Sequence, residues 1–436
     1  MSKRYVFWKR PDGRPYRGTD SQNAPIQILA RIGNGATVEK TGEISWTDFN
    51  LIQWETAVND SLVIIDDAGN ELPSDLASTI TDPAIRDVIK KDGGKKPIEP
   101  PKLLKAADRR AADYFRLLPR RFALVSSMSI NCFPANSLSI GDCDIGPIKH
   151  EKFYPPPKAL TDSWEIGETP ALQRFYGQPV RVFVDARSPF EAASIGIDSL
   201  NLLRGYWMLI TSYGSLTYSL SVSPKRKPVA EVRVGPYHTI HTTDGSPACE
   251  NYWFEPNYHF ADEPFQPRGG WKRVEFARKR LVRKLKAQKY AKEVERLITR
   301  YASALDTTDF DVGFLQIWSI LEKLTNTVGA NYDQTVARTT RLFKEEKTHA
   351  ELLGVMRTRR NQYVHAARSG SGRSLIMYEA KLYVERHILE LIHNKLDLSS
   401  IEEYAEYLCL PTDSAVLRKR KRWIDAVIST FKKSGK

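Results

Sequence analysis

Apolar residues recur every three or four positions through the last third of the chain. In one stretch the spacings are four, three, four, three and four residues. These positions are Phe310, Phe314, Ile317, Leu321, Leu324 and Val328. This periodicity places them on one face of an α-helix. Similar patterns cover 271–305 (one long helix or a pair), 332–347, 349–367 and 374–396. Together they predict an all-α bundle of about 130 residues.

The first 265 residues have a mixed pattern. Short apolar runs at 4–8 and 61–66 predict strands, and alternating apolar positions predict strands at 180–186 and 229–235. A long helical pattern occupies 188–211. We therefore expect an α+β fold, in which a mixed α/β N-terminal region precedes the helical bundle.

Two helices of the N-terminal region have clear signals. At 188–211, Ser188 can cap the helix, Pro189 suits its first position, and Glu191 supplies the acid of a capping box. A shorter helix is expected at 106–118. The stretch 90–102 between this helix and the first strands is rich in Lys, Gly and Pro, which is typical of a linker.

These patterns divide the chain into five parts. We expect a mixed α+β N-terminal unit at 1–90, a linker at 91–105, an α+β sensor or regulatory region at 106–265, the helical bundle at 266–405, and a basic C-terminal tail or helix at 406–436. The chain has 436 residues, so two or three domains of ~150 residues each are expected.

Composition favours a cytoplasmic protein that folds without metal, disulfide or cofactor. The four cysteines are scattered at Cys132, Cys143, Cys249 and Cys409, and none forms a CxxC pair. His238, His241 and His259 are possible metal ligands, but no Glu or Cys stands at helical spacing beside them, so no metal site is expected. The N-terminus carries no apolar signal segment, and no apolar run is long enough to cross a bilayer, so no membrane is expected as a partner.

The net charge of +13 suggests a polyanionic partner, and nucleic acid is the commonest one. Between residues 268 and 300 there are 13 Lys and Arg against 3 Asp and Glu. The candidate nucleic-acid-binding residues in this segment are Arg278, Lys279, Arg280, Arg283 and Lys284. A solvated helix face that only keeps the protein soluble is the alternative interpretation.

The sequence RRNQYVHAARSG at 359–370 carries the candidate chemistry. It contains Arg360, Asn361 and His365 within the predicted bundle. An arginine followed by a polar residue, with a histidine four to six positions after the arginine, resembles the signature of the HEPN superfamily. The apolar helix 314–326, with Glu322 inside it, resembles an earlier helix of that fold. The region upstream, from about 180, also resembles ApeA-like bacterial defence proteins.

The resemblance implies a metal-independent endoribonuclease that acts in antiphage defence by abortive infection, with a phage-derived trigger. The RNA's own 2′-hydroxyl attacks the adjacent phosphodiester, giving a 2′,3′-cyclic phosphate. The residue types suit this chemistry. His365 can transfer a proton near neutral pH, and Arg360 can stabilise charge on the phosphorane. Asn361 would orient the histidine or bind a phosphate oxygen, and Glu322 and Arg359 would support the site.

Helix geometry restricts how this pair can act. Five helical residues place Arg360 and His365 about 140° apart and ~7.5 Å along the axis. One unbroken helix would not aim both side chains at one phosphate. We therefore expect a cleft, a distorted helix end or a second subunit, and the resemblance implies a homodimer.

Three other interpretations remain open at this stage. Arg359, Arg360 and His365 can be surface residues near a helix C-terminus, where positive charge is favourable. The bundle can be a non-catalytic nucleic-acid-binding or dimerisation module. An enzyme site within 120–265 that leaves no recognisable motif is the third.

Overall fold

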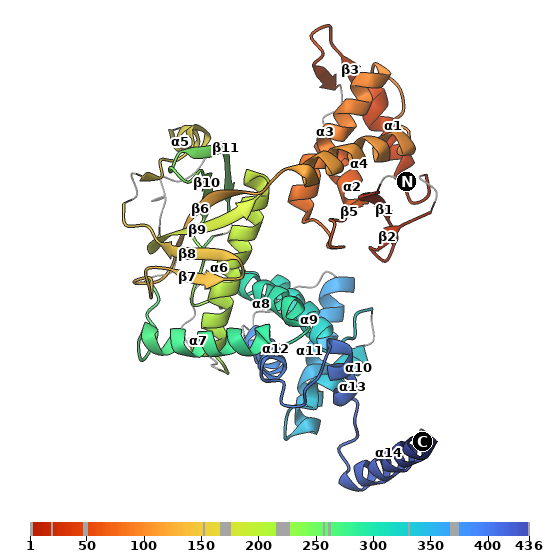
Figure 1. The fold of residues 1–436 in the computed structure, drawn as a ribbon, viewed down its shortest axis with the longest axis vertical. Helices are drawn as coiled ribbons and strands as arrows, with labels where there is room; N and C mark the ends of the chain where they lie inside the picture. The colour runs from red at the N-terminus through yellow and green to blue at the C-terminus, as the bar shows by residue number, and fades with distance from the viewer. Residues whose placement is uncertain are drawn as a thin grey trace.

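The structure, a computed structural model, joins a small N-terminal α+β unit, an antiparallel sheet and a C-terminal helical region (Figure 1). It describes residues 3–18, 21–46, 51–150, 153–165, 176–214, 227–255, 258–259, 263–329, 332–366 and 375–434. None of the described helices has both the length and the apolar character needed to cross a bilayer.

The N-terminal unit packs four helices around a short sheet. Its strands are β1 (Val6–Lys9), β2 (Pro15–Tyr16) and β5 (Leu62–Ile64), in the order β2-β1-β5, with a separate hairpin of β3 (Ala36–Val38) and β4 (Ile44–Trp46). Its helices are α1 (Ile26–Gly35), α2 (Leu51–Asp60), α3 (Ser74–Asp92) and α4 (Pro100–Arg116). The strands predicted at 4–8 and 61–66 are confirmed as β1 and β5.

The segment predicted as a linker, 91–105, is only partly one. Helix α4 begins at Pro100, where proline is tolerated in the first turn, and not at 106. Its buried face of Leu103, Leu104, Ala107 and Ala111 belongs to the same core as β1 and α3. The N-terminal unit therefore extends to α4 because this apolar face completes its core.

The second layer is a six-stranded antiparallel sheet. It consists of β6 (Arg120–Met128), β7 (Leu138–Ile140), β8 (Cys143–Pro147), β9 (Gln178–Ala186), β10 (Tyr237–His241) and β11 (Pro247–Phe254), in the order β11-β10-β6-β9-β8-β7. The short helix α5 (Lys158–Glu165) lies beside β11. Strand β9 confirms the prediction at 180–186.

The prediction of a strand at 229–235 is wrong. Only Val234 forms an isolated bridge, with Met128 at the end of β6. Most of this segment is nevertheless buried, because it crosses the end of the sheet. The Arg233 backbone N–H donates to Ser129 Oγ (2.8 Å), and the Val232 carbonyl accepts from Arg204 Nη1 (3.1 Å).

Helix α6 (Pro189–Thr211) connects the sheet with the helical region. The predicted cap is confirmed, since Glu191 N–H donates to Ser188 Oγ at 3.1 Å. The helix contacts β6 and β9 on one side and α7 and α8 on the other. Its middle is buried almost all round, as expected for a helix between two layers.

The helical region contains eight described helices. These are α7 (Trp271–Lys286), α8 (Ala291–Ala304), α9 (Phe310–Leu324), α10 (Tyr332–Thr340), α11 (Glu346–Ala366), α12 (Leu375–His393), α13 (Ile401–Leu408) and α14 (Ser414–Ser434). The pattern at 271–305 is a pair of helices. The predicted apolar stripe is buried from Phe310 to Leu324, but Val328 is 60% exposed because it lies beyond the end of α9.

A single hydrophobic core crosses the boundary predicted at 265/266. The cluster extends from Phe122 in β6 through Leu203 in α6 to Leu408 in α13. An ion pair reinforces this junction, as the buried Arg204 of α6 donates two hydrogen bonds to the partly exposed Asp306 at the end of α8 (2.6 and 2.5 Å). The sheet and the helical region are therefore packed as one body.

Candidate active site

Helix α9 presents two acidic side chains toward α11. Asp309 caps α9 by accepting from the N–H groups of Asp311 (3.0 Å) and Val312 (3.2 Å), which fixes Asp311 in the first turn. Asp311 is 5% exposed. Glu322 lies three turns further along, where Trp318 Nε1 donates to its carboxylate at 2.8 Å.

The two neighbouring arginines of α11 are held differently. Arg359 donates to Asp311 Oδ1 through Nε (3.2 Å) and Nη2 (2.8 Å), forming a largely buried ion pair. Arg360 instead stacks on Tyr332, with its guanidinium carbon 4.6 Å from the ring centroid. Within the described residues, no carboxylate forms an ion pair with Arg360. Arg359 is thus neutralised, whereas Arg360 keeps its hydrogen-bond donors.

Glu322 interacts electrostatically with Arg360, and no direct hydrogen bond joins the two side chains in the described residues. Burial raises the pKa of Glu322, and both the Trp318 hydrogen bond and the Arg360 charge oppose that rise. The Arg360 charge therefore favours the ionised form of Glu322.

Asn361 contributes an unusual feature. Its side-chain Oδ1 is buried and has no hydrogen-bond partner in the described part of the chain. Buried polar atoms are rarely left unpaired, so such an atom marks a place where a further partner fits. The partner must be a donor, because an amide oxygen only accepts.

His365 is placed by its backbone alone. It lies in α11 one residue before the helix ends at Ala366, and its side chain is outside the described residues. Helix α11 continues without a break from Arg360 to His365. The angular separation expected from the sequence therefore holds for the backbone of these last turns of α11.

A cleft lies one turn before these residues. It has a volume of about 500 Å³ between α10 and α11, and it is lined by Asp333, Arg357 and Gly354 among others. Arg357 forms an ion pair with Asp333. Arg360 does not line this cleft, so the cleft does not bring the Arg360 and His365 side chains to a common binding site.

The candidate nucleic-acid-binding residues divide into two groups. Lys279, Arg280, Arg283 and Lys284 are exposed on α7. Arg278 is 3% exposed and donates three hydrogen bonds to Glu275, which also accepts from Trp207 Nε1 (2.7 Å). The prediction for Arg278 is corrected, because a buried and paired guanidinium is not accessible to a phosphate.

The basic face of α7 and the α11 residues lie on different elements. Helix α7 packs on α6 and α12, whereas α11 packs on α9 and α10. The structure thus places Arg359 against Asp311 and Arg360 against Tyr332, links Glu322 to Arg360 through charge alone, and leaves the α7 cations apart from these residues. Sequence reasoning missed Asp311, Trp318 and Tyr332, whose roles depend on contacts between helices and leave no local pattern.

Two of the three possible metal-ligand histidines have other partners. His238 is fully buried and its Nδ1 lies 2.8 Å from Ser126 Oγ, and burial lowers its pKa to about 4. His241 lies 2.8 Å from the Gly245 carbonyl oxygen and 2.9 Å from Thr239 Oγ1. Among the residues that the structure describes, no group of three His, Cys, Asp or Glu side chains is arranged to hold a metal ion.

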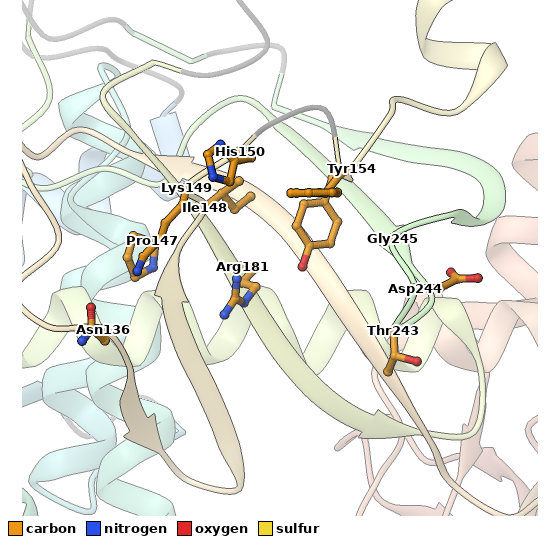
Figure 2. A pocket seen from close by; sticks show the side chains of 11 residues that line it. Asn136, Pro147, Ile148, Lys149, His150, Tyr154, Arg181, Thr243, Asp244 and Gly245 are labelled. Carbon is orange, nitrogen blue, oxygen red and sulfur yellow. The ribbon is translucent and has the colours of Figure 1, made fainter.

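A second pocket lies on the sheet. Its volume is about 470 Å³, and Figure 2 shows Lys149, His150 and Arg181 around it, with Tyr154 and Asp244 on the other side. Arg181 stacks on Phe183 of the same strand, 5.1 Å from the ring centroid. This pocket is separate from the α11 residues and lies within the region predicted to be regulatory.

Comparison of the chain with models of protein families, with curated proteins and with solved structures found no match.

Proposed function

We propose that this chain is a metal-independent endoribonuclease with a HEPN-like helical region and that it serves in antiphage defence. The observation that carries the proposal is the difference between Arg359 and Arg360. Arg359 is bound to Asp311, whereas the Arg360 guanidinium lies on Tyr332. An arginine that is positioned by stacking keeps its N–H groups for phosphate oxygens.

The proposed reaction assigns one step to each residue. The 2′-hydroxyl loses its proton and its oxygen bonds to phosphorus, while the bond from phosphorus to the 5′-oxygen breaks. His365 transfers the proton to or from these oxygens. Arg360 stabilises the negative charge of the phosphorane, and the unpaired Asn361 oxygen accepts from a donor on the substrate or on the histidine. The products are a 2′,3′-cyclic phosphate and a 5′-hydroxyl.

The test compares the wild type with His365→Ala and Arg360→Ala on tRNA and total RNA in EDTA. We expect the wild type to cleave with metal removed, and each variant to lose about 100-fold or more of the rate. The matched control is His393→Ala, because His393 is an exposed histidine on the neighbouring helix α12. Equal cleavage by wild type and His365→Ala, or loss of wild-type cleavage in EDTA, would refute the mechanism.

Defence is tested in cells by expression. The proposal expects the wild type to arrest growth and both the Arg360→Ala and His365→Ala variants to be harmless at equal expression. Recognition of a phage-derived trigger is assigned to the sheet region, whose pocket of about 470 Å³ is open to solvent.

The exposed cations of α7 favour one alternative function. A non-catalytic nucleic-acid-binding or dimerisation module would bind RNA in a salt-dependent way without cutting it. Binding without cleavage and without growth arrest would support this alternative over the nuclease.

A further inference from the structure

Helix α14 projects from the helical region (Figure 1), and most of its described side chains are exposed. From Ser414 to Phe431, every side chain is exposed except that of Leu417, which is half-buried. Phe431 is 72% exposed, Ile424 58% and Trp423 57%. A soluble helix normally buries its large apolar side chains, so these residues require an explanation.

The apolar residues of α14 form one continuous face. They are Val416, Leu417, Trp423, Ile424, Val427, Ile428 and Phe431. At 100° per residue they cover an arc of about 140°, from Trp423 at one edge to Ile428 at the other. Among the positions up to Phe431, only Arg420 interrupts this arc, and it lies near the middle of the arc.

The rest of α14 is basic. Of the five consecutive cations at 418–422, Arg418 and Arg422 lie opposite the apolar arc and Lys419 and Lys421 flank it, and Asp425 is the single acid between 414 and 434. Lys419 lies 5.3 Å from the centroid of the Trp423 ring, at the border between the two faces. A basic face, an apolar face and an aromatic residue at their border are typical of helices that lie in a membrane interface.

A partner for α14 must satisfy both faces. An isolated helix of this length is only marginally stable in water, so covering the apolar face favours the helix itself. A second copy of α14 would cover the apolar face but set the cations of the two helices side by side. RNA would neutralise the cations and leave the apolar face in water. An anionic lipid surface buries the apolar arc and attracts the cations together.

We propose that α14 binds the surface of an anionic membrane, with Ile424, Val427 and Phe431 inserted among the lipids and the cations at 418–422 near the headgroups. The helix lies along the surface and does not cross it. This departs from the sequence-based expectation of no membrane partner, which rested on the lack of a spanning segment. The proposal does not depend on ribonuclease activity.

The test is flotation of the full-length protein with phosphatidylcholine vesicles that contain or lack phosphatidylglycerol. We expect the wild type to float with the anionic vesicles and to float less as salt is added. The double variant Ile424→Gln with Phe431→Gln should bind these vesicles about tenfold more weakly or worse, because two large apolar side chains no longer insert. Glutamine keeps helix propensity close to that of the original residues.

The matched control is Ile52→Gln. Ile52 is a 76% exposed isoleucine on α2 of the N-terminal unit, so it tests whether any exposed apolar residue has this effect. We expect the control to float like the wild type. The double variant Lys421→Gln with Arg422→Gln should lose the preference for anionic vesicles.

Three results would overturn the proposal. The first is equal flotation of the wild type and the Ile424→Gln, Phe431→Gln variant. The second is no flotation together with a wild-type dimer, measured by light scattering, that this variant turns into a monomer, because α14 then pairs with its own copy. The third is no flotation together with weaker RNA binding by the same variant. RNA cleavage is measured separately, so failure here leaves the proposed function standing.

Discussion

Arg359 and Arg360 are adjacent and chemically identical, yet their surroundings give them different roles. Arg359 is bound to Asp311, which is 5% exposed, and Arg360 stacks on Tyr332. The sequence identified both arginines and Glu322 but not which arginine is neutralised. That distinction depends on Asp311 and Tyr332, which come from two other helices and carry no motif of their own.

The Arg359 pairing leads to a prediction about stability. Arg359→Met should lower the free energy of unfolding by about 3 kcal/mol, because Asp311 is left buried without its partner. Adding Asp311→Leu should restore most of this loss, since both charges are then absent. Urea unfolding measures each difference. A single variant as stable as the wild type would show that the pair has no structural role.

At the scale of elements, periodicity predicted helices well and buried irregular segments poorly. The pattern at 188–211 and its cap at Ser188 are confirmed in α6, and the stripe from Phe310 is confirmed in α9. Residues 229–235 alternate in sequence like a strand, but burial does not follow the alternation, since Arg233 is buried and Val234 is half-buried. Local sequence contains no information on which neighbour supplies the hydrogen bonds, so this error could not be avoided.

Helix α7 shows why counting charges overestimates a binding surface. Arg278 belongs to the same basic run as its neighbours but is bound to Glu275 in the interior. Only the residues that follow the other face of the helix reach solvent. The 3.6-residue period predicts that such a run divides between two faces, but not which face is buried.

The exposed α7 residues give a quantitative prediction about RNA binding. Lys279→Gln with Lys284→Gln should weaken RNA binding and reduce the slope of log affinity against log salt by about 1.4 to 1.8, as expected for the loss of two phosphate contacts. Lys90→Gln with Lys91→Gln, two exposed lysines near the end of α3, is the matched control. An unchanged slope in the α7 variant would assign these residues to solubility alone.

At the scale of the whole molecule, the unbroken helix α11 determines how the candidate site can be completed. Arg360 and His365 are about 140° apart on its backbone, and the nearby cleft reaches only as far as Arg357. A homodimer in which Arg360 of one subunit faces His365 of the other would bring the two groups to one phosphate. Symmetric dimers are the commonest oligomers, so this solution needs no special assembly.

Mixing two inactive variants tests this arrangement. Arg360→Ala and His365→Ala proteins, refolded or co-expressed together, should recover about a quarter of wild-type activity, because half of the dimers then contain one intact site of two. The control mixture pairs His365→Ala with the double variant Arg360→Ala, His365→Ala, and it should stay inactive. Mixed dimers that form without regaining activity would place both groups of a site in one subunit.

The continuous core between the sheet and the helical region has a practical consequence for engineering and for evolution. Because α6 packs against both the sheet and α8, and Arg204 reaches Asp306, the helical region is not a transferable cassette. A fragment that starts at residue 266 would expose the α8 surface that α6 covers. It would also leave the Asp306 carboxylate without the Arg204 guanidinium. Any exchange of the helical region between proteins must therefore include α6.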